Sequence, residues 1–216
     1  EPEVLDLISY LKKLGCKISL KKRTIIINGK FNSVPVTHNI MFDRIEAGTY
    51  LIASALIGKK ILISAVKSDI IKTEIGILKK MGVKIKYKKN KIIVYESKKI
   101  KKINLITAPY PGFPTDLQAQ IMVLMTQANG ISKIKENIFE NRFMHVPELK
   151  RMGAKIVIRN NVAYINGPTQ LSGAEVMATD LRASVCLVLA ALIANNKTII
   201  NRIYHLDRGY ENIEKK

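Results

Sequence analysis

Asp116 is the residue of this sequence best suited to acid–base chemistry. It follows a Pro-Gly-Phe-Pro segment and precedes an apolar run, so we expect it at a helix N-terminus, where the helix dipole favours its anionic form. An exposed carboxylate that is held rigidly in this way can act as a general base. The same position also suits a plain N-cap, because aspartate is a common capping residue. The residues alone leave both interpretations open.

Three arginines are candidates for binding an anion. Arg142, Arg182 and Arg208 are three of only eight arginines in the 216 residues, and each lies at or near an expected helix start. A cation at a helix N-terminus opposes the helix dipole, so a purely structural preference would disfavour it there. The planar guanidinium binds carboxylate and phosphate through two parallel hydrogen bonds. The arginines therefore indicate a phosphate or carboxylate site, with a plain surface arginine as the alternative for Arg142.

Other reactive side chains give weaker signals. His145 and His205 are far apart and short of partner ligands for a metal, and His145 is expected to pack or hydrogen-bond near the start of its helix. Cys186 lies inside an apolar helix and Cys16 at a strand start, so both are interpreted as small core residues. The sequence has no Gly-rich phosphate loop, Ser-His-Asp pattern or nucleotide fingerprint. We expect neither a metal nor a cofactor.

The elements that must position these residues recur along the chain. A helix-closing phrase ends in a glycine three times, at Gly15, Gly82 and Gly153, where a left-handed cap is needed. A pair of short alternating strands follows each glycine. The expected pairs are Lys17–Leu20 with Thr24–Asn28, Lys84–Lys88 with Lys91–Tyr95, and Lys155–Arg159 with Val162–Asn166.

A second repeated phrase is an aspartate that opens a very apolar helix, which a strand then follows. Asp43 opens Arg44–Ile57 before Lys59–Val66, Asp116 opens Leu117–Asn129 before Ile131–Lys135, and Asp180 opens Leu181–Ala194 before Thr198–Ile203. A helix without a polar face should be buried on most sides. The repeating unit is therefore strand, buried helix, strand, amphipathic helix, strand, strand. It predicts an α/β (α+β) domain with helices at its centre, sheets around them and pseudo-threefold symmetry.

Composition and charge narrow the class of protein. The chain is 47% hydrophobic, no apolar run reaches the roughly 18 residues of a membrane span, and its first residues lack a signal-peptide pattern. We therefore expect a cytoplasmic protein with no membrane partner. The net charge of +19 could indicate a polyanion partner, but eleven lysines between Lys79 and Lys102 alternate with apolar residues, as on the solvated face of a strand pair. We expect no nucleic acid, and a basic repeat domain that binds polyanions remains the alternative.

Four phrases resemble the enolpyruvyl transferase family, and in particular its UDP-N-acetylglucosamine 1-carboxyvinyltransferases. They are Pro111-Gly-Phe-Pro-Thr-Asp116-Leu-Gln-Ala-Gln120, Ile138-Phe-Glu-Asn-Arg142-Phe-Met-His145-Val-Pro-Glu-Leu149, Met177-Ala-Thr-Asp180-Leu-Arg182-Ala-Ser184, and Arg202-Ile-Tyr-His205-Leu-Asp-Arg208-Gly-Tyr210-Glu211. The resemblance runs from Glu1 to Lys216. It implies an inside-out α/β barrel fold, with two globular domains of three strand–helix repeats each that close on substrates between them.

The resemblance implies a reaction as well. The family members transfer the enolpyruvyl group of phosphoenolpyruvate to the 3-hydroxyl of UDP-N-acetylglucosamine, the first committed step of peptidoglycan precursor synthesis. The sister enzyme that uses shikimate 3-phosphate is the alternative. The His-Val-Pro-Glu-Leu and His-Leu-Asp-Arg-Gly-Tyr phrases fit the cell-wall enzyme better.

The resemblance further implies residue roles. Asp116 matches the carboxylate that contacts the sugar 3-hydroxyl and is the proposed base. Ile138 matches a position whose backbone contacts the nucleotide sugar, and Arg142 and Arg208 match arginines that meet phosphoenolpyruvate. The polar positions that line the cleft between the domains are matched by Asp43, Arg44, Asp180 and Arg182.

Chains of this family are about twice as long, so the resemblance covers a C-terminal half. The other half is expected to carry most uridine contacts and the mobile loop with the catalytic Cys or Asp, the target of fosfomycin. Neither cysteine here matches that loop. We therefore expect the chain alone to lack transferase activity.

The resemblance also suggests where the domains divide. Residues 1–35 are expected to finish the other domain through a helix and a strand pair, and residues 36–216 to form the C-terminal catalytic domain, stopping inside a helix that begins near Leu206. That domain lacks a strand pair at its end. We expect the strands within residues 1–30 to fill the gap, within the chain or by a swap between two chains, because a bare sheet edge favours aggregation.

Overall fold

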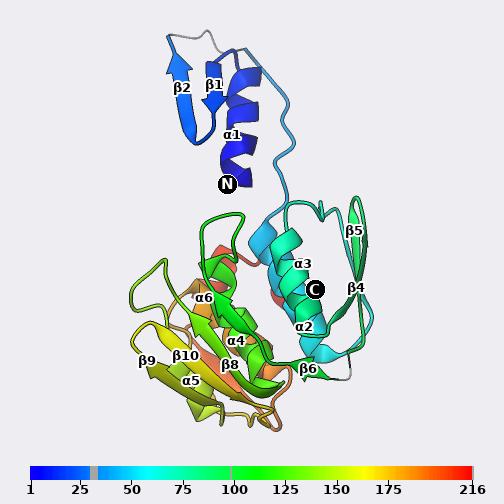
Figure 1. Cartoon of the computed structure of the whole chain (residues 1–216), viewed down its shortest axis with the longest axis vertical. Helices are drawn as coiled ribbons and strands as arrows, with labels where there is room; N and C mark the ends of the chain where they lie inside the picture. The colour runs from blue at the N-terminus through cyan, green and yellow to red at the C-terminus, as the bar shows by residue number, and fades with distance from the viewer. Residues whose placement is uncertain (30–33, 98, 216) are drawn as a thin grey trace. The chain divides into compact units, whose positions relative to one another are not determined.

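The structure, a computed structural model, describes residues 1–29, 34–97 and 99–215. The chain divides into two compact units, residues 1–43 and residues 44–216 (Figure 1). None of the helices in the described ranges has both the length and the apolar character needed to cross a membrane.

The first unit is a helix followed by a hairpin. Helix α1 spans Pro2–Lys13, and strands β1 (Lys17–Lys21) and β2 (Thr24–Asn28) pair antiparallel. Asp6 on α1 accepts hydrogen bonds from the His38 ring at 3.2 Å and from the Met41 backbone at 3.4 Å. These bonds hold the segment 36–43 with the first unit, whereas the sequence analysis grouped it with the second.

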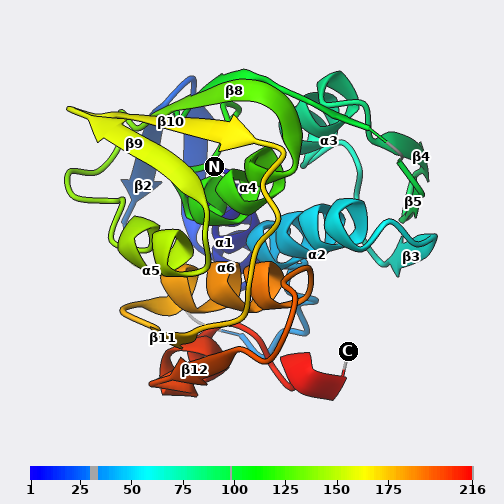
Figure 2. The ribbon, with the colours of Figure 1, turned by 90° about the horizontal axis from the view of Figure 1, so that it is seen from below.

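Three helices form the centre of the second unit. They are α2 (Arg44–Ile57), α4 (Gln118–Thr126) and α6 (Leu181–Ala191). Figure 2 shows them lying together, with sheets outside them. Every residue of α4 is buried, as we expect of a helix that has no polar face.

Three sheets surround the central helices. The first has the strand order β3 (Ile61–Ser64), β5 (Lys91–Tyr95), β4 (Lys84–Lys88). The second has the order β6 (Ile100–Lys101), β8 (Ala128–Lys135), β10 (Val162–Gly167), β9 (Lys155–Arg159), with β7 (Asn104–Ile106) also paired to β8. In the third, β11 (Glu175–Met177) and β12 (Ile199–Asn201) run parallel. The described residues form no closed barrel.

Shorter helices complete the repeats. The two amphipathic helices of this unit are α3 (Lys72–Lys80) and α5 (Val146–Arg151), and the 3-10 helices are η1 (Thr115–Leu117), η2 (Ile203–Arg208) and η3 (Ile213–Lys215). The three capping glycines have the positive φ that the sequence predicts, 97° at Gly15, 91° at Gly82 and 93° at Gly153. The repeated helix caps and strand pairs are thus confirmed.

Several expected boundaries are wrong. Helix α4 ends at Thr126 instead of Asn129, because Ala128 and Asn129 already pair with β6 as the start of β8. Helix α6 likewise ends at Ala191, three residues early.

The helix expected to begin near Leu206 is instead the end of η2, which spans Ile203–Arg208. It stops at Gly209, where an added Cβ would lie 2.9 Å from Cδ2 of Leu181, so a larger residue here would require the Leu181 side chain to move. Arg208 therefore lies at a helix end, where the dipole favours a cation, and the argument from an opposed dipole does not apply to it.

Candidate active site

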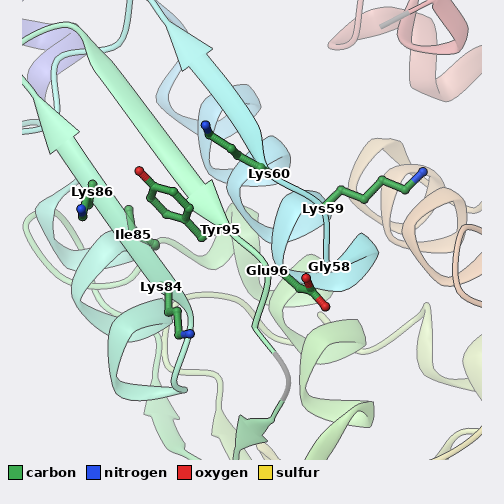
Figure 3. Close-up of a pocket in the computed structure, with 8 residues that line it drawn as sticks. All are labelled: Gly58, Lys59, Lys60, Lys84, Ile85, Lys86, Tyr95 and Glu96. Atoms are coloured by element: carbon green, nitrogen blue, oxygen red, sulfur yellow. The ribbon is translucent and has the colours of Figure 1, made fainter.

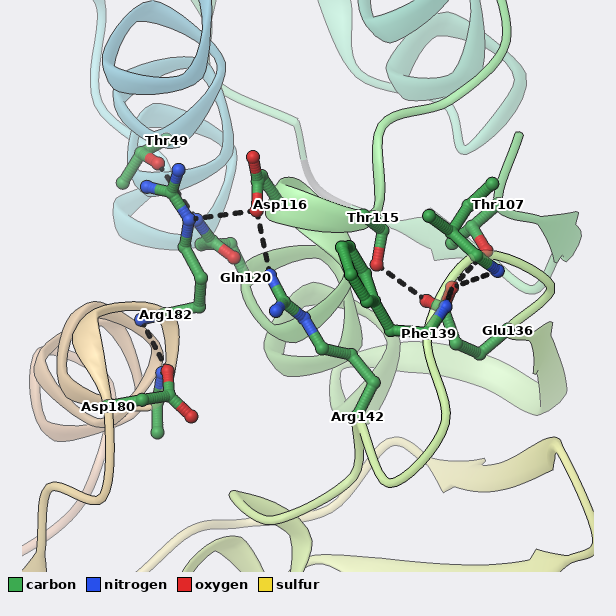
Figure 4. A network of polar contacts seen from close by, with 12 residues as sticks. Thr49, Thr107, Thr115, Asp116, Gln120, Glu136, Phe139, Arg142, Asp180 and Arg182 are labelled. Carbon is green, nitrogen blue, oxygen red and sulfur yellow. Dashed lines mark hydrogen bonds and ion pairs between the residues drawn. The ribbon is translucent and has the colours of Figure 1, made fainter. Parts of the chain in front are cut away.

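One carboxylate and two arginines meet at the N-terminal side of α4 and α6. Oδ1 of Asp116 accepts a hydrogen bond from Nη2 of Arg142 at 2.7 Å and lies 3.2 Å from Nε of Arg182 (Figure 4). We call these three residues the Asp116 cluster. Their side chains are 39%, 26% and 21% exposed, respectively, so the cluster is partly open to a ligand while its geometry is held from both sides.

Asp116 does not cap its helix. It lies inside η1, and the N-cap positions of η1 and α4 are Pro114 and Leu117, neither of which makes a side-chain capping bond. Only Oδ1 is bonded, and Oδ2 has no hydrogen-bond partner among the residues that the structure describes. The capping alternative therefore fails for Asp116, and one carboxylate oxygen is left for a ligand.

Asp180 does cap its helix, and in doing so it positions an arginine. Its Oδ1 accepts hydrogen bonds from the backbone N–H of Arg182 at 2.7 Å and of Ala183 at 2.9 Å. These bonds satisfy free donors of the first turn of α6. Asp180 thus fixes the turn from which the Arg182 side chain reaches Asp116.

A buried polar chain lies behind Arg182. The Tyr210 hydroxyl is 2.8 Å from Oγ1 of Thr49, and Nε2 of Gln120 donates to the same oxygen at 3.2 Å. Tyr210 is 1% exposed. Burial raises the pKa of Tyr210, while its hydrogen bonds to Thr49, Gln120 and Arg182 and the charge of Arg182 oppose that rise. The hydroxyl therefore stays protonated at neutral pH and ties α2, α4 and α6 together.

Glu136 is a buried carboxylate that the sequence analysis missed. It is 3% exposed and follows the last residue of β8. Its two oxygens accept hydrogen bonds from Thr107, Thr115 and the backbone N–H groups of Ile138 and Phe139. A carboxylate at the end of an alternating strand, two residues before Ile138, was the available signal, but its threonine partners are more than 20 positions away.

His145 is a buried residue at the start of α5. Desolvation lowers its pKa to about 4, the negative charge of Asp180 opposes this, and the positive charge of Arg142 adds to it. His145 is therefore neutral at pH 7 and packs at the N-cap position of α5, as expected. No group of three His, Cys, Asp or Glu side chains within the described ranges could hold a metal ion.

The remaining expected site residues lie on other elements. Arg44 is buried, and its guanidinium lies 5.4 Å from the centre of the Tyr110 ring. Arg208 is exposed and forms no ion pair with a described residue. Asp43 is exposed and belongs to the first unit.

A second gathering of cations lies on the outer sheet. A hollow of about 880 Å³ is bordered by Lys59, Lys60, Lys84 and Lys86, together with Gly58, Ile85, Tyr95 and Glu96 (Figure 3). The ammonium groups of Lys60 and Lys86 each lie 5.8 Å from the centre of the Tyr95 ring. We call this the lysine hollow. None of its four lysines forms an ion pair with any residue in the described part of the chain.

Comparison with known proteins finds matches that cover the whole chain. Residues 1–216 match the family described as EPSP synthase (3-phosphoshikimate 1-carboxyvinyltransferase). The chain is 60% identical over 217 residues to a UDP-N-acetylglucosamine 1-carboxyvinyltransferase of Pelagibacter ubique (strain HTCC1062), and 52% identical over 217 residues to that of Geotalea uraniireducens (strain Rf4). Each match covers 100% of this chain and 52% of the relative. The chain thus spans about half the length of these curated relatives.

Solved structures agree with the fold. An enolpyruvyl transferase from Streptomyces tendae superposes with a TM-score of 0.91 at 27% identity, covering 100% of this chain and 52% of that one. An EPSP synthase from Acinetobacter baumannii superposes with a TM-score of 0.72 over 93% of this chain and 50% of that one, and its 17% identity supports the fold alone.

Proposed function

Because this chain belongs to the EPSP synthase family, we propose that it forms about half of an enzyme that moves the enolpyruvyl group of phosphoenolpyruvate to the 3-hydroxyl of UDP-N-acetylglucosamine. The observation that carries the proposal is the Asp116 carboxylate, which two arginines hold by one oxygen while the other oxygen has no described partner. The identity of 60% and 52% to relatives of that name favours the nucleotide sugar over shikimate 3-phosphate as acceptor.

Asp116 is the base in this proposal. Its Oδ2 takes the proton of the sugar 3-hydroxyl as the hydroxyl oxygen forms a bond to C2 of phosphoenolpyruvate, and an acid outside this chain protonates the methylene carbon. Phosphate then leaves with the electrons of its C–O bond, and the methyl group gives up a proton to restore the double bond. A base must stand within hydrogen-bond reach of the proton it removes, and the partly exposed Oδ2 can be approached in this way.

The arginines bind and orient the anions in this proposal. Arg142 donates one hydrogen bond to Asp116 and Arg182 forms an ion pair with it, and the other donors of each guanidinium can meet phosphate or carboxylate oxygens. Arg208, exposed at the end of η2, supplies a third cation from a different element. Asp43 and Arg44 lie at the start of α2 and are assigned to the wall of the cleft.

The curated relatives are about twice as long as this chain. The two-domain protein is the protein that joins this chain to the half that those relatives have in addition. We propose that the first unit completes the other domain of the two-domain protein. Strand β2 is exposed at all five positions although three of its residues are isoleucines. Leu5 and Leu7 on α1 are also exposed. So much exposed apolar surface on one small unit marks a contact face. Sedimentation of the chain alone tests the swapped alternative, which predicts a dimer where completion by the other half predicts a monomer.

We expect the chain alone to release no phosphate from the two substrates, because the acid loop and most uridine contacts are assigned to the other half. Steady-state phosphate release measured on residues 1–216 tests this. A turnover number comparable to that of the two-domain protein would contradict it.

The central experiment replaces the base in the two-domain protein. Asp116→Asn keeps the size of the side chain and removes its ability to take a proton, so we expect kcat to fall by about 10²- to 10⁴-fold. Asp69→Asn is the matched control, since Asp69 is exposed and pairs with the neighbouring Lys72. Phosphate release is measured with UDP-N-acetylglucosamine and with shikimate 3-phosphate as acceptors. A variant with wild-type kcat, or a preference for shikimate 3-phosphate, would contradict the proposal.

A further inference from the structure

Glu136 is held by four hydrogen bonds in the interior of the second unit. Its Oε1 accepts from Oγ1 of Thr107 at 2.8 Å and from the backbone N–H groups of Ile138 at 2.8 Å and Phe139 at 3.2 Å. Its Oε2 accepts from Oγ1 of Thr115 at 2.9 Å. A buried carboxylate is costly unless its oxygens are bonded, and here both are. Removing it would leave the buried Thr107 hydroxyl, the half-buried Thr115 hydroxyl and two backbone donors without this acceptor.

These bonds connect Glu136 to both sides of the Asp116 cluster. On one side, Thr115 directly precedes Asp116 in η1. On the other, the backbone of Phe139 is bonded to Glu136, and the Phe139 ring lies 5.2 Å from the guanidinium carbon of Arg142. Arg142 in turn donates to Asp116, so the contacts form a closed ring (Figure 4).

The same bonds orient a backbone carbonyl. The peptide that joins Ile138 to Phe139 is planar, and in a trans peptide the N–H and the C=O point in opposite directions. Because the Phe139 N–H points to Glu136, the Ile138 carbonyl points away from Glu136. The Ile138 N–H also donates to Glu136, so the carbonyl is the main-chain group that Ile138 can offer to a ligand.

We propose that Glu136 is a positioning residue that sets the base and the Ile138 carbonyl at fixed places relative to each other. It acts on catalysis through Thr115 and Asp116, and on binding of the nucleotide sugar through the backbone of Ile138 and Phe139. The inference rests on the proposed function, because it assigns Glu136 to the same site. Glu136 itself touches no reacting atom.

The test separates the hydrogen bond of Glu136 to Thr115 from its hydrogen bonds to Thr107, Ile138 and Phe139, and uses the two-domain protein. Thr115→Val removes the bond on the side of Asp116, so we expect kcat to fall about tenfold with the KM for UDP-N-acetylglucosamine unchanged. Thr107→Val removes a bond on the other side, where Oγ1 of Thr107 also accepts from the Asn137 N–H at 3.0 Å. We expect it to raise that KM several-fold with kcat unchanged.

Two substitutions of Glu136 complete the test. Glu136→Leu removes every acceptor and should lower kcat and raise KM together, by about the product of the two threonine effects. Glu136→Gln keeps the volume and one acceptor oxygen, and should restore most of both constants. Glu175→Gln is the control, because Glu175 is exposed and bonds the Asn201 side chain away from the cluster.

The outcomes separate this inference from the function on which it rests. If the wild-type two-domain protein transfers enolpyruvate and Thr115→Val and Thr107→Val both keep kcat and KM within twofold, the positioning role is wrong while the function stands. Equal losses of kcat in both threonine variants, with KM unmoved, would indicate a loss of folded protein and would also overturn it. If the wild-type protein transfers no enolpyruvate, the proposed function fails first. Should Glu136→Leu not fold, the threonine variants still decide.

Discussion

The Asp116 cluster and the lysine hollow both gather positive charge, but they hold it in different ways. In the cluster, two arginines are largely buried and their guanidinium groups contact one carboxylate oxygen at 2.7 and 3.2 Å. In the hollow, four exposed lysines line the same depression as Tyr95 and form no ion pair within the described residues. The net charge of +19 counts both regions alike. The difference teaches that a fixed arrangement of charges, rather than their number, marks the region able to do chemistry.

The arginines are ordered because buried polar groups support them from behind. Glu136 and Asp180 hold the backbone on either side of the cluster. The Tyr210 hydroxyl is hydrogen-bonded to Thr49 and to the side chain of Arg182. Of the four lysines, Lys60 and Lys86 lie 5.8 Å from the centre of the Tyr95 ring, and exposed contacts of this kind contribute about 0.5–1 kcal/mol. Four predictions examine this contrast.

The largest effect is expected at Arg142. Arg142→Lys in the two-domain protein keeps the charge but loses the planar fork that bonds Asp116, so we expect kcat/KM for phosphoenolpyruvate to fall about 10- to 100-fold. Arg159→Lys is the control, because the Arg159 side chain is exposed and its guanidinium lies over the Tyr164 ring on the outer sheet. Steady-state phosphate release gives both values. Equal effects of the two substitutions would remove the distinction between ordered and exposed cations.

The second prediction concerns pH. Folding lowers the pKa of His145 from 6.5 to about 4, so between these values the unfolded chain binds more protons than the folded chain. The contribution of His145 to the free energy of unfolding should therefore be complete above pH 6.5. As the pH drops to 4, the free energy of unfolding should fall by up to about 3 kcal/mol. Urea unfolding at pH 7, 5.5 and 4.5 measures this.

His145→Gln has no titrating ring and should flatten this part of the pH profile, whatever it does to stability at pH 7. All other side chains are the same in both proteins, so the difference between the two profiles isolates the histidine. A difference that does not change with pH would show that His145 is not desolvated as described.

The third prediction concerns the buried chain behind Arg182. Tyr210→Phe removes the hydroxyl that bonds Thr49, so we expect the free energy of unfolding to fall by about 1 kcal/mol. Tyr204→Phe is the control, since Tyr204 is 60% exposed. Thermal unfolding of both variants measures the difference. Equal midpoints for the two would mean that the buried hydroxyl contributes nothing to the support of the cluster.

The smallest effect is expected in the lysine hollow. The double substitution Lys60→Gln and Lys86→Gln should change the free energy of unfolding by less than about 0.5 kcal/mol, because exposed substitutions usually do. It should leave kcat within twofold. Binding of polyphosphate at 0.15 M salt is measured in parallel. A tenfold loss of polyphosphate affinity would show that the hollow is an anion-binding site in its own right. It would contradict the contrast between the lysine hollow and the Asp116 cluster.

Local patterns predicted the repeating elements well. The glycines that close α1, α3 and α5 have positive φ because the backbone there must adopt the left-handed helical conformation. A glycine at the end of an amphipathic run predicts this conformation from the sequence. The bounds of α2 were predicted to the residue. The family resemblance, and with it the fold, was confirmed over residues 1–216.

Long-range contacts were beyond the sequence. Asp116, Asp43 and Asp180 all precede apolar helices, yet Asp180 caps its helix while Asp116 bonds arginines 26 and 66 positions away. Glu136 could not be distinguished from a solvated strand end until the fold brought Thr107 and Thr115 to it. The close approach of the Leu181 side chain to Gly209, which follows η2, is likewise a contact that no local pattern encodes.

The Tyr210–Thr49 contact has a consequence for how the protein is made. The two residues are 161 positions apart, so at about 5–20 residues per second the ribosome adds Tyr210 roughly 8–32 s after Thr49. During that interval the Thr49 hydroxyl on α2 lacks the phenol that covers it in the finished fold. The second unit therefore cannot complete this buried contact until the segment that follows η2 has left the ribosome.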